Sequence, residues 1–425
     1  MNKKWLRMVL LLVTVILVVG LVAFSCAAPP TEGPPTEGPP EEGPPEEGPP
    51  PPKTLKMGAH MALSGPAGGW GIPIANGLIL ETEKINNEGG IQIGGETYLI
   101  EMICEDNEYS PEGATTASRK LVERDKVKVI FGGVVTHDTL PMLPMTTPEK
   151  IITGCTCYSG EVLTAETNAP YHFKTSVSPH EAQAPMYDWA FARYPEIQKV
   201  AEITANTMSG IYGQEMSIGY LESIGKEIVA NEYYEFGVTD FYPFLTRMLA
   251  GEPDLIHSTA ATPADWALIM KQSRELGYEG YFLQEIPASP YTIEVAGVEN
   301  IEGLITVAHP SFGELGTPEY ADFIARYEEA YGAWDLLGAW QVPFFHMVVG
   351  AYQMAGTVDD PDRVVELLET ETFYPLGIEG RCGDGGGLYD QPHQVGFTLY
   401  IVEIRNGELD PVGVITVADQ IDRTW

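Results

Sequence analysis

A glycine-rich segment, ALSGPAGGWGIP at residues 62–73, is the first candidate for chemistry. Glycines between a strand and a helix are typical of loops that bind phosphate through backbone amides. The spacing does not fit G-x-G-x-x-G, and the first lysine after Gly71 is Lys84, so the segment is not a Walker A loop either. We therefore expect one wall of a small-molecule site here. Its backbone amides suit a carboxylate, and Trp70 either lines the site or lies in the core.

Motifs for catalysis are missing from the sequence. It contains no G-x-S-x-G nucleophile motif and no H-E-x-x-H metal-binding motif. A second glycine-rich stretch, CGDGGG at residues 382–387, follows no strand that we predict, which favours a loop. We therefore expect no enzyme activity and no cofactor.

The cysteines allow more than one chemistry. In an exported protein an even set could form disulfides, and the set here is Cys104, Cys155, Cys157 and Cys382. We expect the C-T-C spacing of Cys155 and Cys157 to be too short for a comfortable bond between those two. The same pair could be half of a metal site, but no His or second cysteine pair lies near it at a zinc-like spacing. The preferred interpretation is thiols, structural or otherwise, and no metal.

The elements that must position these residues alternate along the chain. Short apolar runs predict strands, and apolar residues spaced three or four apart predict helices between them. Predicted strands cover residues 54–63, 98–106, 127–133, 150–155, 199–206, 227–235 and 254–260. Predicted helices cover residues 74–90, 111–126, 213–225, 242–252, 265–277, 317–332 and 339–356.

This alternation defines the fold class. Strands separated by helices of this length indicate βαβ units and parallel sheets. Roughly eight such units precede Gly303, which is too many for one small doubly wound sheet, so we expect two α/β lobes. Near the C-terminus, Asn406-Gly407 is a strong turn signal and predicts a hairpin over residues 394–413.

The charge of the chain excludes some partners. Its 24 Lys and Arg residues face 60 Asp and Glu residues, a formal net charge of -36. A surface this acidic repels nucleic acid and anionic lipid headgroups. We therefore expect no nucleic-acid partner.

The N-terminus has the pattern of an export signal. Basic residues precede an apolar run over residues 8–24, and AFSC follows at residues 23–26. This predicts a lipoprotein signal peptide over residues 1–25 and lipidation of Cys26, although Ala23 departs from the usual leucine of a lipobox. The alternative is an uncleaved anchor helix. Both predict an extracytoplasmic protein held at the membrane, in the periplasm or on the outer face.

A proline-rich stretch follows the signal. Residues 29–52 contain twelve Pro and six Glu in 24 positions, which favours an extended polyproline II chain. At ~3.1 Å per residue it could reach roughly 75 Å. We predict a semi-rigid tether over residues 26–53. The alternative is a motif for a proline-binding module.

Several longer segments together resemble a known family. They are LSGPAGGWGIPIANGLILETEKINNEGGI, EDNEYSPEGATTASRKLVERDKVKVIFGG, the pair Tyr212-Gly213 after a strand, GVTDFYPFLTRM and KQSRELGY. The chain is similar over residues 55–414 to the branched-chain amino-acid (Leu/Ile/Val) binding proteins. These are type I periplasmic binding proteins that serve ABC importers.

The resemblance implies two doubly wound parallel-sheet lobes joined by three hinge crossings, with a ligand in the cleft. The crossings fall near Lys174–Val177, Leu304–Val307 and Gln394–Thr398. Lobe 1 would comprise residues 54–175 and 306–395, and lobe 2 residues 176–305 and 396–425. A ligand that contacts both lobes favours the closed state, which the importer would recognise.

The family's ligand positions carry over to nine residues of this chain: Ser64, Trp70, Thr136, His137, Tyr158, Ser159, Tyr212, Thr262 and Glu285. Neutral donors would meet a ligand carboxylate, aromatic rings would enclose its apolar part, and Glu285 would pair with an ammonium group or simply be solvated. His137 and Tyr158 are bulkier than the small residues of the amino-acid binders, although His137 could also be an ordinary loop residue. An aromatic acid, an amide or a short peptide-like compound is therefore expected in preference to leucine.

The function implied is capture of an amino acid or a related carboxylate or amide, and its delivery to an ABC importer. The expected partners are the small-molecule ligand, the permease with its ATPase subunits, and the membrane through the lipid anchor. The chain itself is expected to be a monomer. The alternative is a ligand-sensing module of the same fold that feeds a signalling partner.

Overall fold

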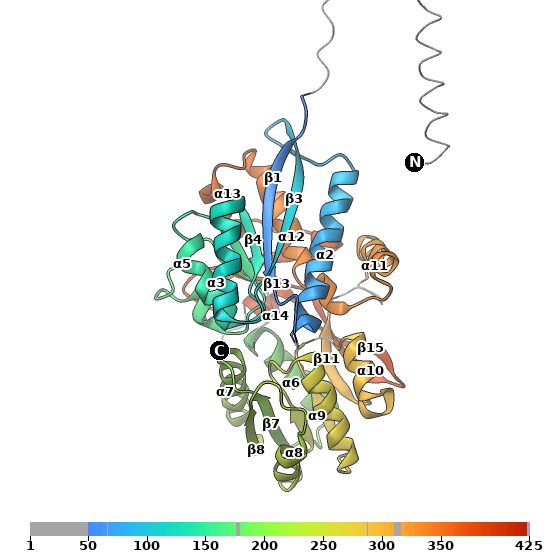
Figure 1. Cartoon of the computed structure of the whole chain (residues 1–425). Coiled ribbons are helices and arrows are strands. Elements are labelled where there is room, and N and C mark those ends of the chain that lie inside the picture. Colours follow the sequence, from blue (N-terminus) through green and yellow to red (C-terminus); the bar gives the residue numbers. More distant parts are fainter. Residues whose placement is uncertain (1–49, 66, 176–178, 287, 310–315, 423–425) are drawn as a thin grey trace, which may run out of the picture. The chain divides into compact units, whose positions relative to one another are not determined.

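The structure is a computed structural model that describes residues 50–65, 67–175, 179–286, 288–309 and 316–422 (Figure 1). The chain from Pro51 onward forms one compact unit. The predicted signal peptide, Cys26 and the tether as far as residue 49 lie outside the described residues, as does Val177 of the first predicted crossing. Among the helices described, none combines the length and the apolar character needed to cross a membrane.

The first sheet has eight strands in the order β12-β13-β6-β5-β4-β1-β3-β2. These are β1 (Lys53–Met61), β2 (Ile91–Ile93), β3 (Glu96–Asp106), β4 (Val129–Gly132), β5 (Ile152–Cys155), β6 (His172–Lys174), β12 (Gly380–Gly383) and β13 (Gln394–Phe397). The six inner strands of this order, which are β13, β6, β5, β4, β1 and β3, run parallel to one another. The two edge strands, β2 and β12, are antiparallel to their neighbours. Helices that contact this sheet are α2 (Gly68–Asn87), α3 (Pro111–Arg119), α12 (Val342–Ala355) and α13 (Pro361–Thr370).

The second sheet has seven strands in the order β15-β14-β11-β10-β9-β7-β8. These are β7 (Lys199–Ala205), β8 (Glu227–Tyr234), β9 (Leu255–His257), β10 (Tyr281–Leu283), β11 (Leu304–Ala308), β14 (Leu399–Arg405) and β15 (Glu408–Ile415). The strands β11, β10, β9, β7 and β8 run parallel to one another. The strand β14 pairs antiparallel with β11, and β15 pairs antiparallel with β14. Helices that contact this sheet are α6 (Ala184–Arg193), α7 (Met208–Ser223) and α8 (Tyr242–Leu249).

The chain passes between the two sheets three times. It leaves the first sheet after β6, returns to it after β11, and crosses again between β13 and β14. Two lobes of mostly parallel strands with three crossings confirm the predicted fold class. The antiparallel edge strands make both sheets mixed.

Several helices begin at a Ser or Thr that is followed by Pro. Ser110, Thr262, Ser289 and Thr317 each accept a hydrogen bond from the backbone N–H three residues further on. The proline occupies the first helical turn, where its missing N–H leaves no hydrogen bond unmade. The sequence thus sets the starts of α3, α9 (Pro263–Glu275), α10 (Pro290–Ala296) and α11 (Pro318–Tyr331).

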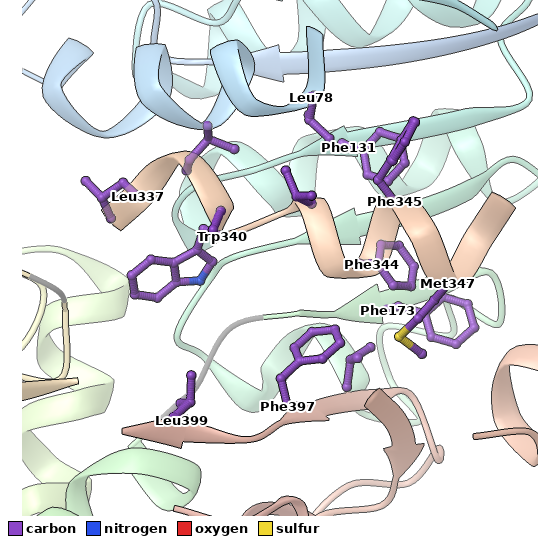
Figure 2. Packing of buried hydrophobic residues seen from close by; sticks show 14 of the residues in the cluster. Leu78, Phe131, Phe173, Leu337, Trp340, Phe344, Phe345, Met347, Phe397 and Leu399 are labelled. Carbon is purple, nitrogen blue, oxygen red and sulfur yellow. The ribbon is translucent and has the colours of Figure 1, made fainter. Parts of the chain in front are cut away.

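The core of the first lobe is built on α12, which is apolar on nearly all sides and therefore buried. The ring centre of Phe344 lies 6.1 Å from that of Phe131 on β4 and 5.5 Å from that of Phe173 on β6. Phe345 lies 5.8 Å from Phe131 (Figure 2). Aromatic pairs at these separations add to the stabilisation from burial alone. This helix fixes two strands whose following loops reach the cleft and the hinge.

Two details differ from the sequence predictions. The hairpin predicted over residues 394–413 is divided, since β13 pairs with the first sheet and only β14 and β15 form the hairpin around Asn406-Gly407. One residue, Thr398, separates β13 from β14, so a single apolar run supplies strands to both sheets. In addition, the first two residues of CGDGGG belong to a strand, and the other four follow it. The strand is β12, which is short and has a glycine at each end, so it gave no apolar signal.

Candidate functional site

A cavity lies where the two lobes meet. The first lobe contributes residues from α2, from the loops after β4 and β5, and from the segment before α12, and the second contributes residues after β9 and β10. The lining residues are Trp70, Ile74, Val134, Val135, Thr156, Tyr158, Leu337 and Trp340 from the first lobe, and Ala260 and Ile286 from the second. Small-molecule sites in open α/β sheets are found at these carboxyl ends of strands. The lining contains no charged side chain among the described residues.

Two polar atoms of the lining residues have no hydrogen-bond partner among the described residues. They are the indole Nε1 of Trp70 and the hydroxyl of Tyr158. Trp70 is 3% exposed and Tyr158 is 4% exposed. Burial raises the pKa of the Tyr158 hydroxyl well above its usual value, so the group stays protonated and can donate. Buried donors are nearly always paired, so these two unpaired atoms distinguish the lining of this cavity.

The wall formed by Val134 and Val135 is held from behind by a buried carboxylate. Asp138 accepts from the backbone N–H groups of Val134 at 3.3 Å and Val135 at 3.0 Å. It also accepts from the side-chain amide of Asn107 at 2.9 Å. Burial raises the pKa of Asp138 to about 7, although these hydrogen bonds act in the opposite direction. The carboxylate therefore shapes the loop after β4 and does not line the cavity.

Thr136 connects the lobes directly. It lies at the start of the short helix α4 (Thr136–Thr139). Its backbone N–H donates to the hydroxyl of Ser209 on α7 at 3.1 Å, and the two hydroxyls lie 2.9 Å apart. Both residues are fully buried. The predicted site residue is thus used for contact between the lobes.

His137 belongs to an aromatic cluster beside the cavity. Its ring lies edge-on to Tyr109, with centres 4.9 Å apart, and its Nε2 is 3.3 Å from the Tyr109 carbonyl oxygen. Tyr109 also contacts Trp70 at 5.8 Å and, across the lobes, Phe236 at 5.2 Å. Partial burial lowers the pKa of His137, which favours the neutral imidazole at neutral pH. His137 therefore supports the wall at Trp70 through Tyr109.

Three other predicted residues have local roles in the backbone. The hydroxyl of Ser159 accepts from the N–H of Glu161 at 3.2 Å, and that of Thr262 accepts from the N–H of Asp265 at 3.1 Å. Ser64 is exposed, and its hydroxyl hydrogen-bonds the carboxylate of Asp106, which lowers the pKa of that group against the effect of burial. These residues are near the cleft, but none lines the cavity.

Tyr212 lies on α7 and reaches across to the other lobe. A Cβ atom added at Gly160 would lie 2.8 Å from the Tyr212 hydroxyl, so that position has no room for a side chain. Burial raises the pKa of Tyr212 to about 12. The residue thus closes the cleft against the loop after β5 rather than lining the cavity.

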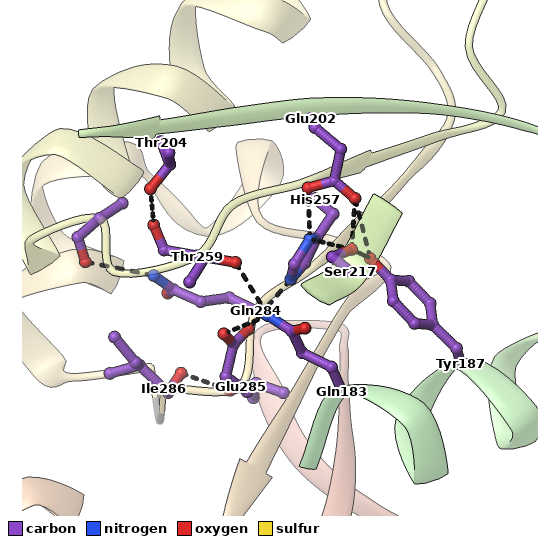
Figure 3. A network of polar contacts seen from close by, with 12 residues as sticks. Gln183, Tyr187, Glu202, Thr204, Ser217, His257, Thr259, Gln284, Glu285 and Ile286 are labelled. Atoms are coloured by element: carbon purple, nitrogen blue, oxygen red, sulfur yellow. Dashed lines mark hydrogen bonds and ion pairs between the residues drawn. The ribbon is translucent and has the colours of Figure 1, made fainter. Parts of the chain in front are cut away.

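Glu285 is held by a buried polar network in the second lobe (Figure 3). Its carboxylate accepts from the side-chain amide of Gln183 at 2.8 Å and lies 3.0 Å from Nε2 of His257. The other imidazole nitrogen of His257 lies 2.7 Å from Glu202. Burial lowers the pKa of His257, but the two carboxylates outweigh it and raise the value to about 10. His257 is therefore a cation at neutral pH that balances part of the charge of Glu285.

Of the nine predicted site residues, Trp70 and Tyr158 line the cavity, and the other seven lie around it. Sequence reasoning missed the other lining residues, which are mostly apolar, namely Ile74, Val134, Val135, Thr156, Ala260, Ile286, Leu337 and Trp340. For five of these a signal existed. Val134, Val135, Thr156, Ala260 and Ile286 each lie within three residues of the end of a strand, where parallel sheets place their binding loops.

Sequence comparison agrees with this arrangement of two lobes around a cavity. A family model described as "Periplasmic binding protein" matches residues 54–408. The match covers most of the chain, so the protein belongs to the periplasmic binding protein family, and within it to the type I fold of the branched-chain amino-acid binding proteins of ABC transporters.

Solved structures share the fold at low sequence identity. A leucine binding protein from Thermotoga maritima is 21% identical, with 85% of this chain and 99% of that chain covered and a TM-score of 0.71. A branched-chain amino acid transporter substrate binding protein from Streptococcus pneumoniae, in complex with isoleucine, is 20% identical. The match covers 85% of this chain and 99% of that chain, with a TM-score of 0.72. A solute binding protein from Rhodopseudomonas palustris BisB5, in complex with 3,4-dihydroxybenzoic acid, is 23% identical. The match covers 86% of this chain and 98% of that chain, with a TM-score of 0.71.

Proposed function

We propose that this protein is an extracytoplasmic solute-binding protein that captures one small molecule in the cavity between its lobes and delivers it to an ABC importer. Family membership supports the class, and its members are binding proteins of transporters rather than enzymes. The observation that carries the proposal is the cavity lined from both lobes, with two buried donors that lack a partner among the described residues. A ligand there contacts both lobes and favours closure.

The ligand we propose has an apolar body and an acceptor group, as in an aromatic or branched carboxylate or amide. Apolar side chains dominate the lining, the indole N–H of Trp70 can only donate, and the protonated hydroxyl of Tyr158 is able to donate as well. An α-amino acid would also need a partner for its ammonium group. Glu285 is the predicted partner, but His257 and Gln183 already engage its two oxygens. Related folds that hold isoleucine or a dihydroxybenzoic acid define the range to test.

The roles we propose for the predicted residues follow their surroundings. Trp70 and Tyr158 contact the ligand. Thr136 and Tyr212 hold the lobes together in the closed state, and His137 supports the aromatic wall. The others shape the loops and the polar network beside the cavity, as described above for Ser64, Ser159, Thr262 and Glu285.

We also propose that the protein is a monomer anchored through a lipid on Cys26, with the proline-rich stretch as a tether. The support for the anchor is the sequence pattern of the N-terminus, together with a family whose location is extracytoplasmic. A tether of this composition would let the binding unit reach a permease in the same membrane.

A thermal-shift screen tests the function and the ligand class together. The panel contains benzoate, 3,4-dihydroxybenzoate, benzamide, isoleucine and leucine. A compound that binds only the folded protein raises its melting temperature. We expect shifts with the acids or the amide. A screen in which only leucine or isoleucine gives a shift contradicts the proposed ligand class, and steady consumption of a hit contradicts the binding-protein assignment.

A pair of tyrosine variants locates the binding site. Tyr158→Phe removes only a hydroxyl, and we expect it to weaken binding of the best carboxylate by about tenfold, the usual effect of losing one hydrogen bond to a charged group. Tyr320→Phe is the matched control, since Tyr320 is also fully buried with a hydroxyl that lacks a partner among the described residues, but it lies on α11, outside the cavity lining. Equal affinities for both variants would reject the site.

A further inference from the structure

The segment after β5 presents two different faces. Thr156 and Tyr158 line the interlobe cavity. Cys155 and Cys157 instead pack into a separate apolar cluster that includes Val162. This alternation is the one expected for an extended chain, in which successive side chains point to opposite sides. The two cysteines therefore lie behind the wall that the ligand is proposed to contact.

The two sulfur atoms are in direct contact. The Sγ atoms of Cys155 and Cys157 lie 2.9 Å apart, and both side chains are fully buried. Residues two apart in a fully extended chain have Cα atoms roughly 6.6 Å apart, at the upper end of the range of about 4.4–6.8 Å that disulfides span, so a bond requires the segment to be slightly less than fully extended. Both cysteines are thiols in the structure, in line with the expectation from sequence, but the contact between their sulfur atoms leaves only a small movement to a bonded geometry.

Backbone hydrogen bonds hold the segment in this extended form. The N–H of Thr156 donates to the carbonyl oxygen of Gly133 at 2.9 Å, and the N–H of Thr175 donates to that of Cys155 at 2.7 Å. The neighbouring loops thereby fix the positions from which the two cysteine side chains extend. Their proximity is a consequence of the fold and does not depend on flexible side chains.

A metal ion and a more distant cysteine are alternative partners to consider for this pair. No group of three or more His, Cys, Asp or Glu side chains within the described residues could hold a metal ion. The remaining described cysteines, Cys104 and Cys382, pack with the main core cluster of the first lobe rather than with the cluster behind the cavity wall. Each cysteine of the pair thus has the other as its nearest sulfur in the same cluster.

We propose that Cys155 and Cys157 are joined by a disulfide bond that closes a small ring around Thr156. The two thiols lose two protons and two electrons as the S–S bond forms. The electrons reduce the disulfide of an extracytoplasmic thiol oxidoreductase or of oxidised glutathione, which leaves as two thiols. Because both sulfurs are buried in the folded protein, the bond forms during folding and is afterwards shielded from reductants.

The ring restrains the backbone of the cavity wall. Thr156 lies inside it and Tyr158 follows it directly, so the conformations available to both side chains are reduced before a ligand arrives. Less conformational freedom then has to be given up on binding. The proposal requires that the chain folds outside the cytoplasm, but it does not depend on which ligand is bound.

Peptide mass spectrometry tests the bond. Trypsin cleavage after Lys150 and Lys174 releases residues 151–174, which contain Cys155 and Cys157 and no other cysteine. The full chain is exported, purified without reductant, denatured in iodoacetamide and digested. We expect this peptide to carry no alkyl group and to be lighter than the reduced peptide by two hydrogen atoms. After reduction it should take up two alkyl groups.

Two results would overturn the proposal. One is a doubly alkylated peptide without prior reduction, and the other is a cross-link from this peptide to one that contains Cys104 or Cys382. The Cys157→Ser variant is the control, since Cys155 should then be alkylated without reduction. That result shows that the reagent reaches this position in the denatured chain. Failure of the ligand screen would leave the mass of this peptide unchanged, so the two proposals fail separately.

Discussion

At the scale of single residues, hydrogen-bonding groups near the cleft are of two kinds. The first kind belongs to the second lobe, where the side chains of Glu202, His257, Glu285 and Gln183 bind one another in a buried network (Figure 3). The second kind belongs to Trp70 and Tyr158, whose polar atoms have no partner among the described residues. A ligand gains most from the second kind, because pairing a buried donor removes the cost of leaving it unpaired.

The buried ion pairs of His257 predict a pH dependence of stability. Its pKa is about 10 in the folded protein, against an ordinary value of 6.5. A group whose pKa is raised by folding contributes stability that is complete below the unfolded pKa and is lost as the pH rises through the folded pKa. The contribution of His257 should therefore disappear between about pH 6.5 and about pH 10.

Chemical denaturation of wild type and His257→Gln at about pH 7 and about pH 9.5 checks this. We expect the wild-type protein to lose more unfolding free energy over that interval than the variant, since the variant lacks the titrating group. Parallel behaviour of the two proteins would contradict the assignment. An NMR titration of the His257 imidazole in the wild-type protein provides the same information without a substitution.

Two of the site residues predicted from sequence lie in the cavity lining, and their role in binding stays a prediction. Tyr158 lines the cavity from the loop after β5, and Trp70 lines it from the first turn of α2. Glu285 could not be judged in the same way. Its partners, Gln183 and His257, lie 102 and 28 residues away in sequence, and only the fold brings them into contact. The site assignments for all nine residues remain predictions.

At the scale of elements, the binding loops depend on how firmly the strands before them are packed. The loops after β4 and β5 carry half of the cavity wall of the first lobe, and α12 packs on β4 through Phe344 and Phe345 (Figure 2). An apolar helix in this position serves the site without touching the ligand. Sequence predicted this helix but not its contacts.

Truncation within α12 measures this packing. Phe344→Ala leaves a cavity among buried rings and should cost about 3–5 kcal/mol of unfolding free energy. Met354→Ala is the control in the same helix, where the side chain is 52% exposed, and should change stability by no more than about 0.5 kcal/mol. Urea denaturation gives both values. Similar effects of the two substitutions would show that α12 is not the buried element described.

The elements were predictable to the extent that their signal is local. The spacing of apolar residues indicated the helices, and short apolar runs indicated the central strands. Short strands such as β10 and β12 gave no such signal, because three or four residues suffice when neighbouring strands supply the hydrogen bonds. The division of residues 394–405 between two sheets is a tertiary property that a single apolar run does not encode.

At the scale of the whole molecule, contacts across the cleft accompany a buried ion pair at the hinge. Thr136 with Ser209, and Tyr109 with Phe236, join the lobes on the side of the cavity. Behind it, Lys174 on β6 lies 3.8 Å from Glu181, just beyond the first crossing, and both are fully buried. The closed arrangement thus has direct contacts of its own, to which a ligand adds.

The proposed lipid anchor predicts where the protein is found in cells. Cys26→Ser should move the protein from the membrane fraction to the soluble extracytoplasmic fraction, because the acylated residue is lost. Cys382→Ser, in the buried strand β12, should leave it with the membrane. Fractionation and immunoblotting distinguish the two. Continued membrane association of Cys26→Ser would favour the uncleaved anchor helix over the lipid.

The most direct measurement of the central claim is a crystal structure of the wild-type protein with the strongest hit of the ligand screen. We predict that the ligand lies between the lobes, in contact with Ala260 and Ile286 on one side and with Trp70 and Tyr158 on the other. Its acceptor group should lie within hydrogen-bond distance, about 2.7–3.2 Å, of Trp70 Nε1 or the Tyr158 hydroxyl. A ligand bound outside this cavity, or touching one lobe only, would contradict the claim.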